Sequence, residues 1–294
     1  MPFRTKLIAP TAELAGLVNT FYIIETDAER IAEAIPAYSA QLIVVVRGAL
    51  AFTYADGRTA RSATVTLNAP LLRSAACSLE GPVTLVGVSF AHASWQAFAN
   101  LPADEVHDQL VDANAVMTHE QIKRLTTAAR ACAEGRIPPE ALCPHLGAAI
   151  AAAPFPPRAD HVATVQAILA WLTSGFDPAL DDLYAAVSIS PRQLQRICRR
   201  FFGVAPAQVL KRFRALRAMM LLAQPGINPA VADALMATYF DQAHLIRDIR
   251  RYTGRTPTQW RKWSLARALL DPAAHGEAGV LLRPARSAAE PVPG

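Results

Sequence analysis

The sequence predicts a two-domain α+β fold, in which a strand-rich N-terminal domain with trailing helices precedes an all-helical domain. Three observations predict it. Short apolar runs separated by turn signals fill the first third of the chain. Helical periodicity replaces them from Ser94 onward. A segment near the C-terminus is then repeated once, at an offset of 51 residues. A chain of 294 residues is long enough for about two domains.

Residues 1–92 are expected to form a small β-barrel or sandwich. Short apolar or alternating runs bounded by turn residues are typical of strands. Ala55-Asp56-Gly57-Arg58 has the composition of a hairpin turn. The runs are Thr20–Glu25, Gln41–Arg47, Ala49–Tyr54, Ala63–Leu67 and Val83–Phe90.

The secondary structure of the remaining segments is predicted from apolar periodicity and from the positions of prolines. Apolar residues recur every three or four positions over 93–153, which predicts helices there. The prolines of 154–160 exclude a continuous helix, so we place a linker between the domains at that point. Residues 161–265 again have a helical pattern. The tail from Asp271 to Gly294 is rich in Ala, Pro and Gly without periodicity, and 266–294 is expected to be disordered.

Positive charge is concentrated in the helical half. The whole chain has a net charge of +5, but residues 160–265 carry 14 Lys and Arg against 7 Asp and no Glu. Residues 1–159 carry 12 basic and 14 acidic residues. This asymmetry suggests a polyanionic partner for the helical half. A solvated basic surface gives the same counts, so charge alone leaves both interpretations open.

The repeated segment indicates two homologous helical subdomains. Leu194–Gln208 aligns with Leu245–Gln259 without a gap. Two copies are too few for a solenoid, which needs about three or more. The identical pairs are Leu194/Leu245, Arg196/Arg247, Arg199/Arg250, Arg200/Arg251, Gly203/Gly254, Pro206/Pro257 and Gln208/Gln259.

Each copy has the pattern of a helix-turn-helix. Ser190 and Asp241 are favourable N-caps, and Pro191 suits a first helical position. The second helix of such a unit fits the major groove, where Arg can bond guanine and Gln can bond adenine. We therefore expect Arg192, Gln195 and Arg196 to read bases. Phosphate contacts are expected further along each helix, at Arg199, Arg200, Arg250 and Arg251.

One amphipathic helix, Ala207–Leu222, is predicted to join the two copies. Its buried stripe is Val209, Leu210, Phe213, Leu216, Met220 and Leu221, and its solvent side is Lys211, Arg212, Arg214 and Arg217. A rigid connecting helix fixes the distance between two reading helices. Adjacent major grooves on one DNA face lie about 34 Å apart, so one chain can bind both without dimerising.

These residues resemble the AraC/XylS-type transcriptional regulators over about residues 165–263. The resemblance rests on Ser190–Arg196, Gly203–Pro206, Arg217-Ala218 with Leu221-Leu222, Asp241–Arg247 and Gly254–Pro257. It implies that both reading helices enter successive major grooves, with Arg192, Gln195, Arg196, Gln242, His244 and Arg247 at the DNA-reading positions. It also implies that the N-terminal domain is a cupin-like β-barrel that senses a ligand or mediates dimerisation.

The chain departs from the family pattern around both turns. The family usually has Ala at the position of Tyr184 and Gly at the positions of Ser188 and Thr238. Asp233 stands where a buried apolar residue is expected. A second subdomain that binds weakly, or that only orients the first, is consistent with these departures.

No catalytic, cofactor or metal site is predicted, and no ligand site is identified. G-x-S-x-G, P-loop and G-x-G-x-x-G motifs are absent, and the seven His are scattered. Four Cys without a CxxC pair are expected to be reduced thiols. The first residues lack the pattern of a signal peptide, and no run of about 18 apolar residues occurs, so we expect a cytoplasmic location and no membrane partner.

The predicted function is a non-enzymatic, sequence-specific DNA-binding regulator of transcription that works without a cofactor and is controlled through its N-terminal domain. Its expected partner is double-stranded DNA. RNA polymerase, an unidentified small-molecule or protein effector, and a second copy of the chain are further candidates. Two alternatives remain open: an interaction scaffold with a degenerate helix-turn-helix domain, and a cupin-type enzyme with a DNA-binding appendage.

Overall fold

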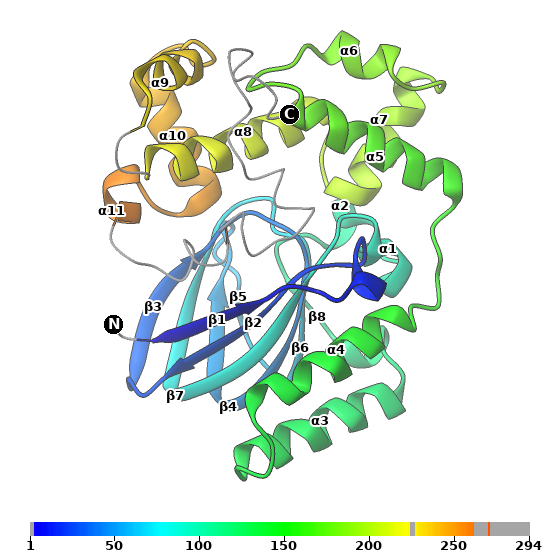
Figure 1. Ribbon diagram of the computed structural model, residues 1–294, viewed down its shortest axis with the longest axis vertical. Helices are drawn as coiled ribbons and strands as arrows, with labels where there is room; N and C mark the ends of the chain where they lie inside the picture. The colour runs from blue at the N-terminus through cyan, green and yellow to red at the C-terminus, as the bar shows by residue number, and fades with distance from the viewer. Residues whose placement is uncertain (1–2, 224–226, 262–269, 271–294) are drawn as a thin grey trace, which may run out of the picture.

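The computed structural model describes residues 3–223, 227–261 and 270, and the predicted two-domain α+β architecture is confirmed (Figure 1). The strands are β1 (Arg4–Ile8), β2 (Val18–Thr26), β3 (Arg30–Ile35), β4 (Gln41–Thr53), β5 (Thr59–Arg61), β6 (Val65–Asn68), β7 (Ala75–Phe90) and β8 (Leu110–Val111). The helices are α1 (Ser94–Ala99), α2 (Ala103–Val106), α3 (His119–Ala133), α4 (Leu142–Ala151), α5 (Ala159–Thr173), α6 (Leu180–Ala185), α7 (Pro191–Phe202), α8 (Pro206–Leu222), α9 (Pro229–Met236), α10 (Gln242–Thr253) and α11 (Pro257–Arg261). Within the described ranges, no helix is long and apolar enough to cross a bilayer.

The N-terminal strands form one bent antiparallel sheet in the order β1-β2-β7-β4-β6-β8, with β3 paired to β7 and β5 to β4. The long strands β4 and β7 are paired from Gln41, opposite Ser89, to Thr53, opposite Ala76. Register shifts on both sides of Arg47 interrupt this ladder. Such irregularities bend a strand and increase its twist, which curves the sheet around its own interior.

Both faces of the sheet are buried along β2 and along the second half of β7, which explains the continuous apolar runs there. Phe21 and Ile23 of β2 face a core that includes Leu146 of α4. The alternate residues, Tyr22 and Ile24, face the inside of the curved sheet. Successive side chains of a strand point to opposite faces, so a strand covered on both sides needs no polar face.

The predicted strand runs overlap strands, with three differences. Gln41–Arg47 and Ala49–Tyr54 fall on one long strand, β4, which ends before Tyr54. Val83–Phe90 is only the second half of β7, and β6 begins at Val65, after the first two residues of the predicted run. The hairpin turn is confirmed, since the Tyr54 amide donates to the Arg58 carbonyl at 2.9 Å. β3 was not expected from the sequence, because Ala and Glu have low strand propensity and its pairing with β7 determines its conformation.

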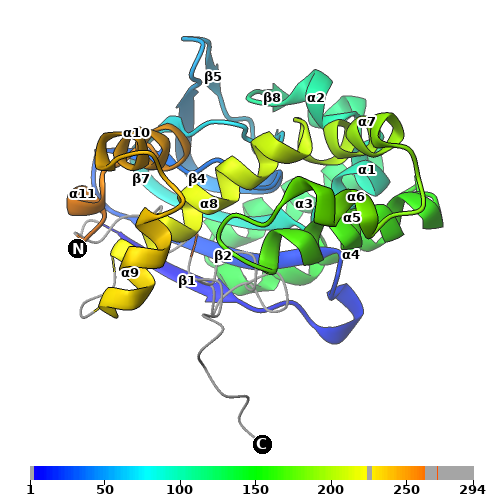
Figure 2. The ribbon, with the colours of Figure 1, turned by 90° about the horizontal axis from the view of Figure 1, so that it is seen from above.

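The helical half contains both predicted helix-turn-helix units, α6–α7 and α9–α10, joined by α8 (Figure 2). The Ser190 hydroxyl accepts from the Gln193 amide at 3.3 Å, and the Asp241 carboxylate accepts from the His244 amide at 2.6 Å, which confirms both N-caps. α4 ends at Ala151 and α5 begins at Ala159. The position of the domain boundary at 154–160 stays a prediction.

The predicted disordered tail, 266–294, lies outside the described residues except for Leu270. That prediction is wrong for Leu270, whose side chain is only 1% exposed and belongs to the core of the helical domain. Burying the apolar side chain of Leu270 in this core stabilises its position and offsets the conformational entropy lost on ordering it. The composition of the tail gave no sign of this contact.

The prediction for the solvent side of α8 is also wrong at two arginines. Arg217 is 1% exposed and donates to the carbonyls of Leu172 and Gly175 at 2.8 and 3.1 Å. Arg212 is 3% exposed, and burial lowers the pKa of both guanidinium groups, that of Arg217 to about 10. Both arginines donate hydrogen bonds to backbone carbonyls of other elements. The helical periodicity of α8 contains no information about such acceptors, so it assigned these side chains to solvent.

The two copies differ in charge at one buried position. Ile197 lies in the core under α7, and its repeat equivalent in α10 is Asp248, which is 3% exposed. The Asp248 carboxylate lies 3.3 Å from Nζ of Lys211 in α8 and 3.4 Å from Nε2 of His244. An ion pair therefore replaces an apolar contact between α10 and α8.

The domains meet at the C-terminal ends of the two repeated helices. The amides of Ala37 and Ser74 donate to the carbonyls of Tyr252 and Arg251, at 2.7 and 3.1 Å. Gly254 ends α10 with φ +73°, and a Cβ there would lie 2.6 Å from the Ala34 Cβ. Only glycine combines this backbone conformation with such a close approach.

The equivalent end of α7 contacts the N-terminal domain in the same manner. Gly203 has φ +81°, and a Cβ there would lie 2.7 Å from the Leu72 side chain. Nη2 of Arg200 donates to Oδ1 of Asn100 at 3.2 Å. Beyond α10, Nη2 of Arg255 lies 2.6 Å from Oε2 of Glu33. Both α7 and α10 are thus held by the N-terminal domain.

A buried histidine lies at the centre of this interface. The His92 ring stacks on Phe202 with centroids 4.9 Å apart and also packs against Phe213 and Tyr38. Burial, together with the nearby Arg212 cation, lowers the pKa of His92 to about 3. The imidazole is therefore neutral in the folded chain.

Replacing His92 with Phe is expected to remove an acid-sensitive contribution to stability. The unfolded chain, with a His pKa of about 6.5, binds one more proton than the folded chain between pH 6.5 and 3, so stability falls as pH falls through that window. At pH 5 the loss is about 2 kcal/mol. Denaturant unfolding at pH 7 and pH 5 should show a smaller loss in His92→Phe; an equal loss in both chains would contradict the buried neutral imidazole.

Removing one member of the Lys211–Asp248 pair is expected to destabilise the second subdomain. Asp248→Ala leaves the ammonium without its partner, and we expect a loss of about 2 kcal/mol in the free energy of unfolding, below the range for fully buried pairs because Lys211 is partly exposed. Lys211→Met combined with Asp248→Leu should restore most of it. Denaturant unfolding of both variants measures this, and equal losses in the single and double variants would rule out the pair.

Candidate nucleic-acid interface

The exposed face of α7 carries three arginines in a row, here called the α7 stripe. Arg192, Arg196 and Arg199 are all exposed, while Leu194 and Ile197 on the opposite face are buried. Residues spaced by four and three positions share one face of a helix. Three cations thus point away from the core along one line.

The exposed face of α10 repeats this arrangement as the α10 stripe. Ala243, Arg247 and Arg250 occupy the repeat positions of the α7 stripe, and all three are exposed. Gln242, in the first turn, is also exposed. The second stripe has one cation fewer, because Ala243 takes the place of Arg192.

Two of the sequence-predicted base readers are held by protein contacts. Gln195 is half-buried, and its amide donates to the Tyr184 hydroxyl at 3.5 Å. His244 is half-buried between Asp248 and Tyr239, whose ring centroid lies 5.4 Å from its own. Tyr184 stands at a position where the family has Ala, so this departure brings a new partner to Gln195.

Two of the predicted phosphate contacts lie toward the N-terminal domain. Arg200 bonds Asn100 as described above, and Gln96 donates to the Arg200 carbonyl at 3.5 Å. The Arg251 guanidinium lies 5.6 Å from the ring centroid of Tyr252 and lines a cavity between the domains. Arg199 and Arg250 remain on the exposed stripes.

The exposed charge of the helical half is therefore smaller than the sequence count suggests. Arg212 and Arg217 are buried, and the Arg214 side chain stacks over Tyr239 at 4.7 Å and pairs with Asp177 at 2.7 Å. Asp233, which stands where the family pattern has a buried apolar residue, is exposed, so its carboxylate is not desolvated. The two stripes thus supply most of the exposed cations of α7 and α10.

Phe240 is a surface residue that the sequence patterns did not identify. It precedes the N-cap of α10, and 93% of its area is exposed. An exposed phenylalanine beside a reading helix can contact a thymine methyl group. Its position between two helices, outside any apolar periodicity, gave no sequence signal.

Neither a metal cluster nor a reactive thiol is found among the described residues. No group of three or more His, Cys, Asp or Glu that could hold a metal occurs in the described ranges. Burial raises the pKa of Cys77 and of Cys198 to about 12, so both are neutral thiols and poor nucleophiles.

Two family models match the chain. Residues 183–262 match a helix-turn-helix domain, and residues 6–112 match a domain of unknown function, DUF6597. No curated protein matches the chain.

Solved structures with a similar arrangement have low identity. ToxT of Vibrio cholerae bound to an unsaturated fatty acid is 8% identical, with 90% of this chain and 96% of that chain covered and a TM-score of 0.47. The AraC-like transcriptional activator CuxR is 10% identical, with 84% of each chain covered and a TM-score of 0.29. EutQ of Clostridium difficile is 15% identical over 30% of this chain and 68% of that chain, with a TM-score of 0.23.

The match over 183–262 includes α7, α8 and α10, which carry the repeat, both stripes and the motif residues of the resemblance. Its geometry is that of two helix-turn-helix units on one connecting helix. The helical half is therefore a helix-turn-helix domain, and its motif residues resemble those of the AraC/XylS-type transcriptional regulators.

Proposed function

We propose that this chain is a transcriptional regulator that binds DNA sequence-specifically, with α7 and α10 in two successive major grooves. The observation that carries the proposal is the exposure of the α7 and α10 stripes at repeat-equivalent positions. α8, with 17 residues, is about 25 Å long and joins the two units as one rigid element. A fixed connection of this kind suits two binding blocks at a defined separation.

The residues of each stripe take different roles by their position. Arg192 and Arg196, toward the N-terminal end of α7, are proposed to read bases, and Arg247 with Gln242 does so from α10. Arg199 and Arg250 lie one turn further on and are proposed to contact phosphates. Gln195 and His244 can read bases only after leaving their protein partners, and Arg200 and Arg251 can reach phosphates only after leaving the domain interface.

The N-terminal domain is proposed to set how the two helices meet DNA. Both helix ends dock on it, through Gly203 and Gly254, so a signal that changes this docking changes the relative pose of α7 and α10. A ligand shifts the equilibrium between two docking arrangements only if it binds one arrangement more tightly than the other. RNA polymerase and a second copy of the chain remain candidate partners.

Selection from random duplexes at about 150 mM salt is expected to recover two sequence blocks about one helical turn apart. Arg196→Ala should lower affinity about 5- to 150-fold for sites with an intact first block and relax selection there, since a bidentate base contact is worth about 1–3 kcal/mol. Arg247→Ala should do the same for the second block.

The matched control is Arg130→Ala, which removes one exposed cation from α3. It should retain both blocks and the native affinity. If selection recovers no enriched motif, and if Arg130→Ala and Arg196→Ala change DNA affinity equally, sequence-specific binding is contradicted. Such a result would favour the scaffold alternative.

Glu33→Gln is expected to loosen the docking of the second unit, because it removes the charge facing Arg255 at 2.6 Å. Operators whose two blocks are moved apart by one or two base pairs should then lose less affinity than they do with the native chain. Competition binding measures this. Glu29→Gln, an exposed neighbour just before β3, is the control. An unchanged spacing penalty in Glu33→Gln would contradict the proposed role of docking.

A further inference from the structure

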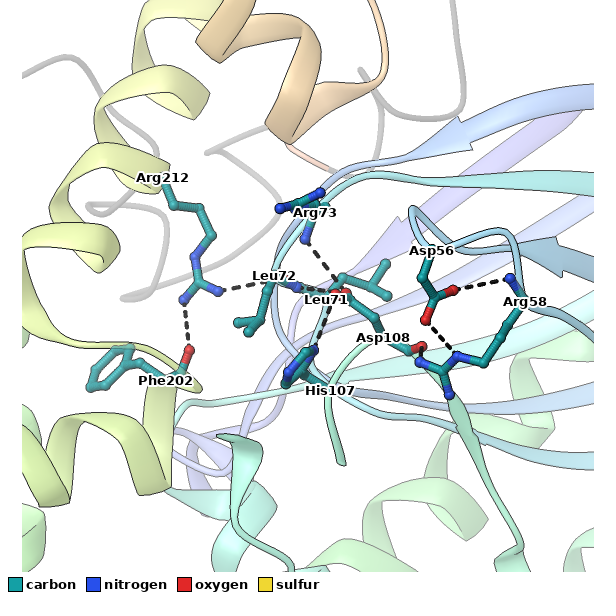
Figure 3. Close-up of polar contacts among 9 residues, drawn as sticks. All are labelled: Asp56, Arg58, Leu71, Leu72, Arg73, His107, Asp108, Phe202 and Arg212. Atoms are coloured by element: carbon teal, nitrogen blue, oxygen red, sulfur yellow. Dashed lines mark hydrogen bonds and ion pairs between the residues drawn. The ribbon is translucent and has the colours of Figure 1, made fainter. Parts of the chain in front are cut away.

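A cavity of about 360 Å³ lies between the two domains. Its N-terminal wall is formed by the β4–β5 turn and by the segments around Leu72 and Asp108 (Figure 3). Its C-terminal wall is formed by the beginning of α8 and the end of α10. This volume lies within the range of small-molecule sites, about 300–1,000 Å³.

The two carboxylates of this cavity are already engaged. Asp56 lies 2.5 Å from Nε of its neighbour Arg58. Asp108 accepts from the Leu72 amide at 2.8 Å through Oδ1, and its Oδ2 lies 3.1 Å from Nδ1 of His107 (Figure 3). Both groups therefore serve the N-terminal wall itself.

Three guanidinium groups around the cavity lack such a partner. Arg73, Arg212 and Arg251 all line it, and none of them forms an ion pair with any other residue that the structure describes. Arg73 and Arg251 are exposed and come from different domains. The cavity thus combines a net positive charge with donors from both of its walls.

Arg212 is a buried cation whose hydrogen bonds are long and incomplete. Its Nη1 and Nη2 donate to the carbonyls of Leu71 and Phe202, both at 3.4 Å, and its Nε has no partner among the described residues (Figure 3). A buried charge is costly unless it is paired and hydrogen-bonded. An anion in the cavity would provide the countercharge that these two long bonds do not.

We propose that this cavity binds a small organic anion with a doubly charged head group, such as a phosphate monoester or a dicarboxylate. Arg73 and Arg251 hold the head group from opposite walls, since planar guanidinium groups bind such oxygens in a bidentate manner. Arg212 neutralises it from the buried side. Apolar contacts for the carbon skeleton come from Leu72, Val204 and Tyr252.

A bound anion ties the end of α10 to the N-terminal domain and so strengthens the docking described above. Its effect on DNA binding rests on the proposed function, whereas binding of the anion itself does not. The test therefore uses the full chain without DNA.

The experiment measures thermal unfolding and titration calorimetry with inorganic phosphate, glycerol 3-phosphate and succinate, each against chloride at equal ionic strength. We expect a saturable rise in Tm with at least one of these dianions. A rise with the two phosphate compounds alone identifies a phosphate ester, and a rise with succinate alone identifies a dicarboxylate. Arg73→Ala should weaken binding at least tenfold, whereas Arg30→Ala, an exposed arginine of β3, should not.

Arg212→Gln tests the buried cation, and its circular dichroism shows whether the chain has folded. A folded Arg212→Gln variant should lose the rise in Tm, and Arg73→Ala keeps the test decisive if it does not fold. Absence of any rise beyond that in chloride, or equal losses in Arg73→Ala and Arg30→Ala, would overturn the proposal. Saturable anion binding by a chain that selects no DNA motif would refute the proposed function but leave this site standing.

Discussion

The ends of α7 and α10 constrain the rest of the molecule. The last carbonyls of a helix have no hydrogen-bond donors within the helix. At the end of α10, the amides of Ala37 and Ser74 donate to two of these carbonyls. Gly203 and Gly254 lack the Cβ that would otherwise separate the helices from the N-terminal domain. The N-terminal domain therefore acts as part of the C-terminal cap of α10, and the orientation of α7 and α10 depends on it.

The C-terminal fold could be predicted because its determinants are local. Ser190, Asp241 and the two cap glycines mark helix ends by chemistry that acts within a few residues, and the repeat doubles each signal. Long-range partners were not predictable. Periodicity assigned Arg217 to solvent, whereas the carbonyls of Leu172 and Gly175, more than 40 residues away, make its burial tolerable. β3 likewise depends on pairing with β7 rather than on its own composition.

In the candidate DNA interface, too, local features could be predicted from the sequence and long-range contacts could not. Exposure of the α7 and α10 stripes follows from amphipathic pattern, because the opposite faces of these helices carry the apolar core. The contacts of Gln195 with Tyr184, and of Arg200 with Asn100, depend on neighbouring elements whose positions a single helix does not encode. The charge asymmetry suggested a polyanionic partner for the helical half, but its count included Arg212 and Arg217, which are buried.

Amide hydrogen exchange of the full chain in solution tests the docking of α10 most directly. The amides of Ala37 and Ser74 donate across the domain interface, whereas the Leu71 amide donates to Tyr38 within the N-terminal domain and serves as an internal reference. If α10 is docked as described, all three amides are protected from exchange. Protection at Leu71 together with fast exchange at Ala37 and Ser74 would show that the helix end is free, and that the N-terminal domain does not orient the reading helices.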